Sequence, residues 1–242
     1  MMLCFARRCL KEMLRDPLTV LFGIGFPVVV LLLLSLIQAN IPVELFALPS
    51  LTPGIAVFGL SFISLFSAQL ISRDRTTAFM LRLYTSPMRA ADFILGYTLP
   101  LLPLSIVQMA VCFVVAMILG LPFSWNVFLT IVVLIPTALV FIALGLLCGS
   151  IMNEKQVGGL CGALLTNLSA WLSGTWFSLD LMGRTFRRIA FSMPFARAVE
   201  AGRAVMRGDL REVLPDLIWV ICWAIVLCIL AVICFRHKMR DE

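Results

Sequence analysis

The sequence predicts an all-α integral membrane protein with six transmembrane helices, and three observations support this fold class. The chain of 242 residues is 62% hydrophobic and 13% charged, whereas soluble domains are roughly 45–50% apolar and 25% charged. Charge-free stretches recur at the length that a membrane-spanning helix needs, about 20 residues. The basic residues lie mostly between these stretches. This pattern excludes an ordinary soluble enzyme, and it favours a membrane over nucleic acid as the reason for the net charge of +6.

Residues 1–17 are predicted to form an amphipathic helix that lies in the inner membrane interface. One face of this helix is apolar and consists of Met2, Leu3, Ala6, Leu10, Met13 and Leu14. The opposite face carries the basic residues Arg7, Arg8, Lys11 and Arg15. A helix of this kind binds the headgroups of anionic membrane lipids. A short flanking helix that only sets the topology is the alternative.

The six spans are predicted near residues 18–38, 51–71, 94–119, 126–151, 157–177 and 216–235. The charge-free stretch that holds the third and fourth spans is too long for one helix. It divides at residues 120–126, where Gly, Pro, Ser and Asn form a turn-like cluster with an interfacial Trp. The first apolar run is longer than the core of a signal peptide and is followed by a poor cleavage site, so we expect a retained span.

The distribution of Lys and Arg predicts that both termini are cytoplasmic. Four basic residues lie before the first span and four lie in the loop after the second span, whereas the loop 39–50 carries none. The segment between the fifth and sixth spans is the exception, because it holds seven Arg and six crossings place it outside. Charge bias alone favours a five-crossing alternative. Two amphipathic helices resting in the outer interface would allow the external location, because their Arg side chains could reach water.

Apart from Asp216, the first residue of the last predicted span, the spans contain no Asp, Glu, Lys, Arg or His, and the chain has one His and no P-loop motif. We therefore expect no catalytic residue, no metal site and no cofactor bound to this chain. The eight cysteines are predicted to pack as small apolar side chains, because most lie in apolar runs and no C-x-x-C occurs. If the protein moves a cargo uphill, the energy comes from another chain.

Polar and small residues inside the spans are candidates for a pathway or for helix packing. Asn167 lies near the middle of the fifth span, where it could line a pathway or form a hydrogen bond between helices. Two G-x-x-x-G pairs, Gly145 with Gly149 and Gly158 with Gly162, would allow close approach of helices.

The loop after the second span is predicted to contain a short cytoplasmic helix. Asp74, Thr76 and Thr77 supply the residue types that begin a helix, and Pro87 ends it. Phe79, Met80 and Leu83 form an apolar ridge on this helix. An amphipathic helix at the membrane face suits docking into a groove of a partner protein. A solvated loop whose charges set the topology is the alternative.

The order of these features resembles the membrane subunit, or permease, of ABC type-2 exporters over nearly the whole chain. The family usually has Glu where this chain has Asp74, Gly where it has Thr76, and Asn where it has Met193. The residues that carry the resemblance are Arg15-Asp16-Pro17, Asp74, Thr76-Thr77, Ser86-Pro87, Gly96 and the stretch from Met193 to Glu200.

The resemblance implies one ABC type-2 transmembrane domain over residues 1–242, in the plasma or inner membrane, that is not itself an enzyme. It implies a cytoplasmic coupling helix that docks on a separate ABC ATP-binding subunit, which binds ATP and Mg. A second permease copy or a paralogue would complete the transporter, and drugs, lipids and polysaccharides are family cargoes. Membrane lipids, and no nucleic acid, are the other expected partners. Carried over by position, the coupling contacts would be Asp74, Thr76, Thr77, Phe79, Leu83 and Pro87.

Two hypotheses from other functional classes are alternatives to the exporter. One is a membrane-embedded assembly or regulatory subunit without a transport pathway. The other is a carrier that works without nucleotide.

Overall fold

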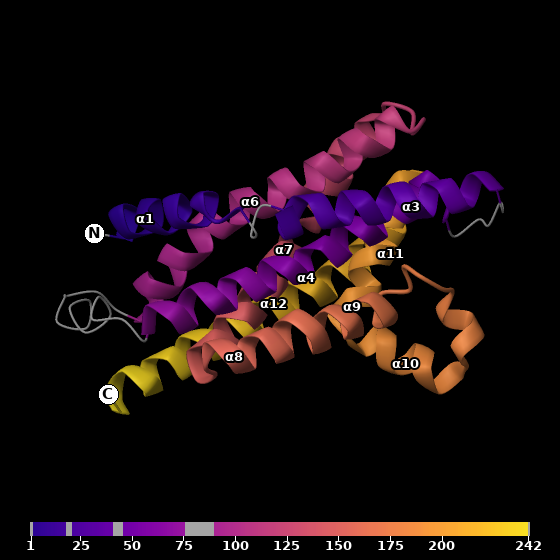
Figure 1. Cartoon of the computed structure of the whole chain (residues 1–242). Helices are drawn as coiled ribbons and strands as arrows, with labels where there is room; N and C mark the ends of the chain where they lie inside the picture. Colours follow the sequence, from indigo (N-terminus) through magenta and orange to yellow (C-terminus); the bar gives the residue numbers. More distant parts are fainter. Residues whose placement is uncertain (1, 18–20, 41–45, 76–89, 242) are drawn as a thin grey trace.

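The structure, a computed structural model, describes residues 2–17, 21–40, 46–75 and 90–241, and every regular element in these ranges is helical. Figure 1 shows the long helices side by side in a bundle, with both termini at the same end. The elements are α1 (Met2–Arg15), η1 (Leu21–Gly25), α3 (Phe26–Asn40), α4 (Leu48–Arg75), α6 (Ala90–Ile118), α7 (Trp125–Ile151), α8 (Glu154–Val157), η3 (Gly158–Leu165), α9 (Thr166–Leu172), η4 (Leu179–Met182), α10 (Arg184–Ser192), α11 (Pro194–Arg207) and α12 (Leu210–Asp241).

Within the described ranges, five helices are long and apolar enough to cross a membrane. They coincide with five of the six predicted spans and cover Leu21–Asn40, Leu48–Arg75, Ala91–Ile118, Trp125–Ile151 and Leu210–His237. The predicted span near 157–177 is instead built from α8, η3 and α9, each of which is shorter than a span. Figure 1 shows α8 and α9 in one line along the bundle. The integral membrane fold is therefore supported, and the sixth crossing stays a prediction.

The interruption at η3 has a local cause in the sequence. This segment has the wider π-helical turn and contains Gly158, Gly159 and Gly162. Glycine is a poor helix former because it loses the most backbone entropy on ordering. The predicted span therefore forms as linked helical segments and not as one uniform helix.

The turn predicted at residues 120–126 is confirmed. α6 ends at Ile118 and α7 begins at Trp125. Gly120 adopts a φ of 113°, in the region that favours glycine. Ser124 caps α7, since its Oγ accepts a hydrogen bond from the backbone N of Asn126.

α4 is the central helix of the bundle. Nearly all of its residues from Leu51 to Ser72 are buried, by contacts with α7, α6, α11 and α3. By contrast, α3 and α12 expose large apolar side chains, such as Leu33 on α3 and Ile225 on α12. Because these helices belong to segments that are long enough to span a membrane, we expect their exposed apolar side chains to face lipid.

The segment between α9 and α12 differs from the two interfacial helices that its pattern predicts. α10 is amphipathic and largely exposed, but α11 is buried from Pro194 to Val205 against α12, α7 and α4. Its small residues explain this position: a Cβ on Gly202 would lie 2.8 Å from Cβ of Pro53 in α4. The predicted apolar face of α11 is present, but the bundle covers it.

α1 also differs from the prediction of a helix that contacts mainly lipid. Phe5, Ala6, Cys9 and Met13 are buried, and Leu10 is half-buried. α1 packs against α6, and Figure 1 shows it at the end of the bundle where both chain termini lie. The predicted apolar residues Met2, Leu3 and Leu14 have side chains outside the described part of the structure.

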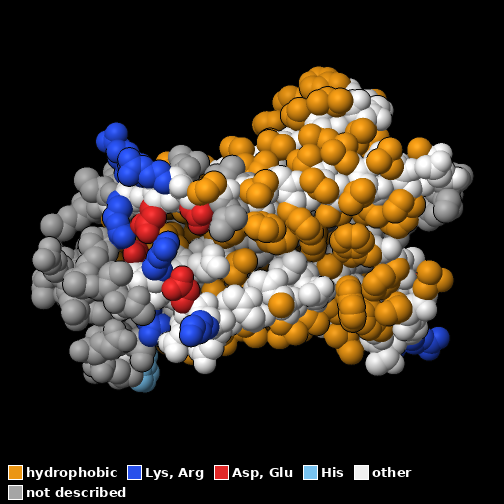
Figure 2. Space-filling model, viewed as in Figure 1, with side chains coloured by type: hydrophobic (Ala, Val, Ile, Leu, Met, Phe, Trp, Pro, Cys, Tyr) orange, Lys and Arg blue, Asp and Glu red, His pale blue; other side chains and the backbone are white. Residues whose placement is uncertain are grey.

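Figure 2 shows how the charges are distributed on one face of the molecule. Lys, Arg, Asp and Glu side chains gather at the end where α1 lies, whereas hydrophobic side chains cover most of the remaining face. We call the end that contains α1 and the C-terminal ends of α4 and α7 the charged end. The end that contains α10 and the start of α12 is the distal end.

Candidate functional site

A buried carboxylate, Asp74, joins three helices at the charged end. Arg8 of α1 donates from Nη2 to Oδ1 at 2.9 Å and from Nη1 to Oδ2 at 3.2 Å. Tyr97 of α6 donates from Oη to Oδ2 at 2.9 Å. Asp74 is 1% exposed, and a carboxylate is stable at such a position when it is paired and hydrogen-bonded. These bonds hold the end of α4 against both α1 and α6.

An aromatic contact supports the same junction. The ring of Phe5 meets the rings of Tyr97 and Phe93 edge to face, with centroids 4.8 and 6.1 Å apart. Phe5 also covers Gly96, where a Cβ would lie 2.5 Å from Cδ1 of Phe5. Glycine at position 96 therefore provides the space for the ring, and α1 packs closely on α6.

Cys9 is buried in this junction. Burial raises the pKa of its thiol from the ordinary 9.0 to about 12, and the negative charge of Asp74 adds to the increase. The Cys9 thiol is therefore protonated at physiological pH, so it is a packing side chain and not a nucleophile. The other described cysteines are free as well.

The next residue of α4, Arg75, contacts a fourth helix. Its Nη1 donates to the carbonyl oxygens of Gly149 and Ser150, at 3.1 and 2.6 Å, in the last turn of α7. Carbonyl groups at a helix C-terminus lack partners within the helix and carry partial negative charge, so a guanidinium is favoured there. Asp74 and Arg75 together fix the end of α4 to α1, α6 and α7.

These two residues directly precede the predicted coupling segment. The described chain stops at Arg75 and resumes at Ala90. Among the predicted coupling contacts, the structure therefore places Asp74 in the junction. The others, Thr76, Thr77, Phe79, Leu83 and Pro87, lie outside the described residues.

The two glycine pairs have different surroundings. A Cβ on Gly145 would overlap Oγ of Ser67 and the carbonyl oxygen of Ser64, and a Cβ on Gly149 would overlap Ile71 and Ala68. α7 thus approaches the backbone of α4 through its glycines. Gly158 has no atom within 4 Å of a Cβ position, and Gly162 faces Leu65 of α4 at 3.4 Å.

Asn167 lies at an exposed position of α9, and its Nδ2 donates to the carbonyl oxygen of Ala163 at 2.8 Å within its own helical segment. It lines a cleft of about 480 Å³ with aromatic walls. The lining residues are Phe26, Phe58, Phe62, Gly162, Thr166, Asn167, Ala170, Trp171 and Trp176. The Asn167 amide therefore has a hydrogen-bond partner four residues earlier in the chain, and it also borders the cleft.

At the distal end, arginines of the segment 180–216 form internal contacts. Arg203 is 7% exposed and donates to the carbonyls of Ser50 and Gly174, each at 3.0 Å, as well as to Glu200. Arg197 pairs with Asp216 at 2.7 Å. The pairs Arg187–Asp180 and Arg207–Glu212 add two further contacts with carboxylates. Four of the seven arginines therefore form ion pairs with carboxylates of the same segment.

The sequence did not identify Arg8, Arg75 or Tyr97 as site residues. In the sequence, Arg8 is only one of the basic residues of the N-terminal helix. Arg75 follows the last turn of an apolar run, and Tyr97 lies near the start of the next run. Among the described residues, no group of three or more His, Cys, Asp or Glu side chains is placed to hold a metal ion.

Comparison with protein families matches residues 2–206 to the ABC-2 type transporter family. This range extends from α1 to the end of α11 and includes the whole junction at the charged end. A search of curated protein sequences gives no match. Because the family match covers most of the 242 residues, the chain belongs to the ABC-2 type transporter family and is a multi-pass membrane protein of the permease-subunit type.

Proposed function

We propose that this chain is the transmembrane permease subunit of an ATP-driven exporter. It moves a hydrophobic or amphiphilic cargo, such as a drug, a lipid or a polysaccharide, out of the cell. ATP and Mg bind to a separate ABC ATP-binding subunit. The observation that carries the proposal is the junction at the end of α4, where Asp74 and Arg75 connect the start of the predicted coupling segment to three other helices.

The junction supports a mechanism for energy transfer. A helix formed by residues 76–89 would present Phe79 and Leu83 to a groove on the ATP-binding subunit. Movement of that subunit would pull on the end of α4 directly. Because Asp74 bonds to α1 and α6 while Arg75 bonds to α7, the same movement would displace four helices together.

The pathway is proposed to run beside the aromatic cleft that Asn167 lines. A second permease copy or paralogue would cover this face and give the Asn167 amide a polar environment. Both termini would be cytoplasmic, in a plasma or inner membrane, with α8, η3 and α9 forming the sixth crossing.

The proposal is tested by isolating the full chain from its native membranes in a mild detergent. We expect an ABC ATP-binding subunit to co-purify, and we expect the complex reconstituted in vesicles to hydrolyse ATP in a permease-dependent manner. Transport by the purified chain without nucleotide would instead identify a carrier. A stable complex without a nucleotide-binding protein would identify an assembly or regulatory subunit.

A further inference from the structure

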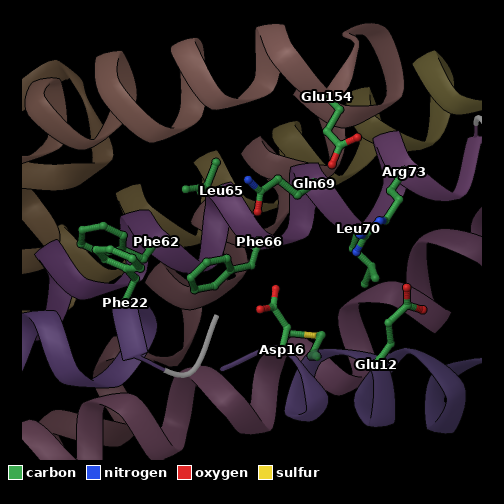
Figure 3. A pocket seen from close by; sticks show the side chains of 11 residues that line it. Glu12, Asp16, Phe22, Phe62, Leu65, Phe66, Gln69, Leu70, Arg73 and Glu154 are labelled. Carbon is green, nitrogen blue, oxygen red and sulfur yellow. The ribbon is translucent and has the colours of Figure 1, made fainter. Parts of the chain in front are cut away.

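A cavity of about 450 Å³ opens between α1 and α4 at the charged end. Figure 3 shows the side chains that line it: Phe22 and Phe62 lie at one end, Glu12 and Arg73 lie at the other, and Phe66 and Asp16 lie between them. The described residues that line it are Glu12, Met13, Asp16, Phe22, Phe62, Leu65, Phe66, Gln69, Leu70, Arg73 and Glu154. Its volume is in the range of small-molecule sites, about 300–1,000 Å³.

The cavity follows the axis of α4 from its charged end toward the middle of the bundle. Phe62 and Arg73 are eleven residues apart on this helix, which corresponds to about 16 Å at 1.5 Å per residue. The polar side chains lie near the charged end of α4, and the phenyl rings lie deeper in its apolar part. A molecule that fills this space must therefore be amphiphilic, with its polar group at the charged end.

The charge of the lining favours a positively charged occupant. The described lining residues carry three carboxylates and one guanidinium, that of Arg73. Glu12 is paired with Arg8 at 3.1 Å within α1, so the attraction for a cation depends on Asp16 and Glu154. In Figure 3 the carboxylates of Asp16 and Glu154 point into the space from opposite sides, one from α1 and the other from α8. An organic cation between them would gain electrostatic attraction, and the aromatic rings below would contact its apolar groups and interact with its charge.

A more basic surface adjoins the cavity and shares Glu12, Asp16 and Arg73 with it. A shallow groove beside the cavity is lined by Arg7, Arg8, Lys11, Arg15 and Arg73, with Glu12, Asp16 and Pro17. Its basic residues suit the headgroups of anionic lipids. An anionic lipid layer at this position would raise the local concentration of organic cations beside the cavity.

We propose that the cavity between α1 and α4 binds amphiphilic organic cations, of the class of phosphonium or quaternary ammonium ions with aromatic groups, and receives them from the inner leaflet as cargo. The assignment as cargo rests on the proposed exporter function. Binding itself depends on this chain alone. Glu154 and Asp16 attract the charge, and Phe62 and Phe66 contact the apolar groups.

The test compares two ions of matched size and opposite charge, tetraphenylphosphonium and tetraphenylborate. The full chain is placed in nanodiscs of phosphatidylcholine without nucleotide or ATP-binding subunit, and bound ion is measured against empty nanodiscs. We expect saturable binding of tetraphenylphosphonium with at least tenfold preference over tetraphenylborate. Equal binding of the two ions, or no binding above empty nanodiscs, would overturn the proposal.

Matched variants locate the binding site. Glu154→Gln removes a charge from an exposed side chain and keeps its shape, so it is expected to fold and to weaken tetraphenylphosphonium binding at least threefold. Glu154→Gln combined with Asp16→Asn is expected to weaken binding at least tenfold. Glu212→Gln, at the distal end, makes the same chemical change and should leave binding unchanged. Unaltered binding in the Glu154→Gln variant would exclude this cavity.

The outcome also separates the cation site from the exporter function. A chain that binds tetraphenylphosphonium selectively but recruits no ATP-binding subunit would refute the exporter and support the site. A chain that recruits such a subunit but binds both ions equally would refute the site and leave the exporter standing.

Discussion

Arg8 donates two hydrogen bonds to Asp74, at 2.9 and 3.2 Å, and thereby joins the N-terminal helix to the end of the central helix α4. Arg8 also pairs with Glu12 at 3.1 Å within α1. The basic face of α1 is therefore not wholly directed at lipid, because one of its arginines neutralises a buried carboxylate. In the proposed exporter, this bond makes α1 part of the mechanism that responds to the coupling segment.

Replacing Asp74 is expected to destabilise the protein strongly. The Asp74→Asn variant keeps the shape of the side chain but leaves Arg8 and Tyr97 without the charged acceptor. Removing one member of a buried pair costs about 3–5 kcal/mol, and partial exposure of Arg8 reduces the expected loss to about 2–4 kcal/mol. Thermal unfolding of the purified chain would measure this change.

The matched control is Asp180→Asn, which removes the acid of the exposed pair Asp180–Arg187. An exposed pair contributes about 0–1 kcal/mol, so this variant should melt close to the wild type. Equal melting temperatures for the two variants would contradict the role assigned to Asp74.

The Cys9 thiol is expected to resist alkylation at neutral pH. Its pKa of about 12 exceeds the unfolded value near 9, so the folded protein has about a thousandfold less thiolate at pH 8. The folded state therefore favours the protonated thiol. The protonated Cys9 thiol makes its full contribution to the stability of the folded protein below pH 9. This contribution declines as the pH rises from about 9 to 12.

A variant that keeps Cys9 as its one cysteine allows the measurement with N-ethylmaleimide. We expect labelling to be slow at pH 7–8 in the native state and fast after unfolding in dodecyl sulfate. Introducing Gly96→Ala should accelerate native labelling, because the new Cβ displaces Phe5 and loosens α1. Rapid native labelling of Cys9 without that change would show that α1 is not packed as described.

Gly145 and Gly158 should respond oppositely to the same substitution. Gly145→Ala is expected to destabilise the bundle by about 1–3 kcal/mol or more, because the new Cβ overlaps Ser67 and the backbone at Ser64. Gly158 has helical dihedral angles and open space beside it. Gly158→Ala should therefore be neutral or stabilising, by about 0.5–1 kcal/mol. Denaturation of both variants in the same detergent measures the two changes in stability. Equal destabilisation would contradict the close contact of α7 with α4.

The long apolar runs and the turn near Gly120 could be predicted from the sequence, because hydropathy and turn chemistry are local properties. The junction could not, because Arg8 and Asp74 are 66 positions apart in the chain and their pairing depends on tertiary packing. The burial of α11 was also not predicted. Its apolar face is visible in the sequence, but its alanines and Gly202 gave no direct sign that other helices would cover the remaining sides.

The segment 180–216 is expected to lie outside the cytoplasm. Four of its seven arginines form ion pairs within the segment, but the positive-inside rule counts Lys and Arg and not net charge, so the location needs a direct test. Single cysteines at positions 184 and 209, in a cysteine-free variant, should react with a membrane-impermeant maleimide in intact cells. A cysteine at Lys155, at the opposite end of α8–α9, should react only after lysis. The reverse pattern at positions 184 and 209 would leave five crossings.

The loop between α4 and α6 is expected to transmit energy from the ATP-binding subunit. Phe79 and Leu83 are predicted to form an apolar ridge that a short helix cannot bury by itself. Removing an aromatic anchor from an interface commonly costs about 2 kcal/mol or more, which is over tenfold in affinity. Phe79→Ala or Leu83→Asp should therefore reduce co-purification of the ATP-binding subunit and lower transport-stimulated ATP hydrolysis.

The control for this prediction is Arg89→Ala, which lies off the ridge and should have a much smaller effect. Membrane insertion and the melting temperature of the isolated chain should be unchanged in all three variants, because the ridge is predicted to contact the partner and not the bundle. The Asp74→Asn variant should differ: it loses both stability and coupling, since Asp74 lies inside the junction. If both ridge variants keep full complex formation and full coupling, the loop only sets the topology, and energy must reach α4 by another route.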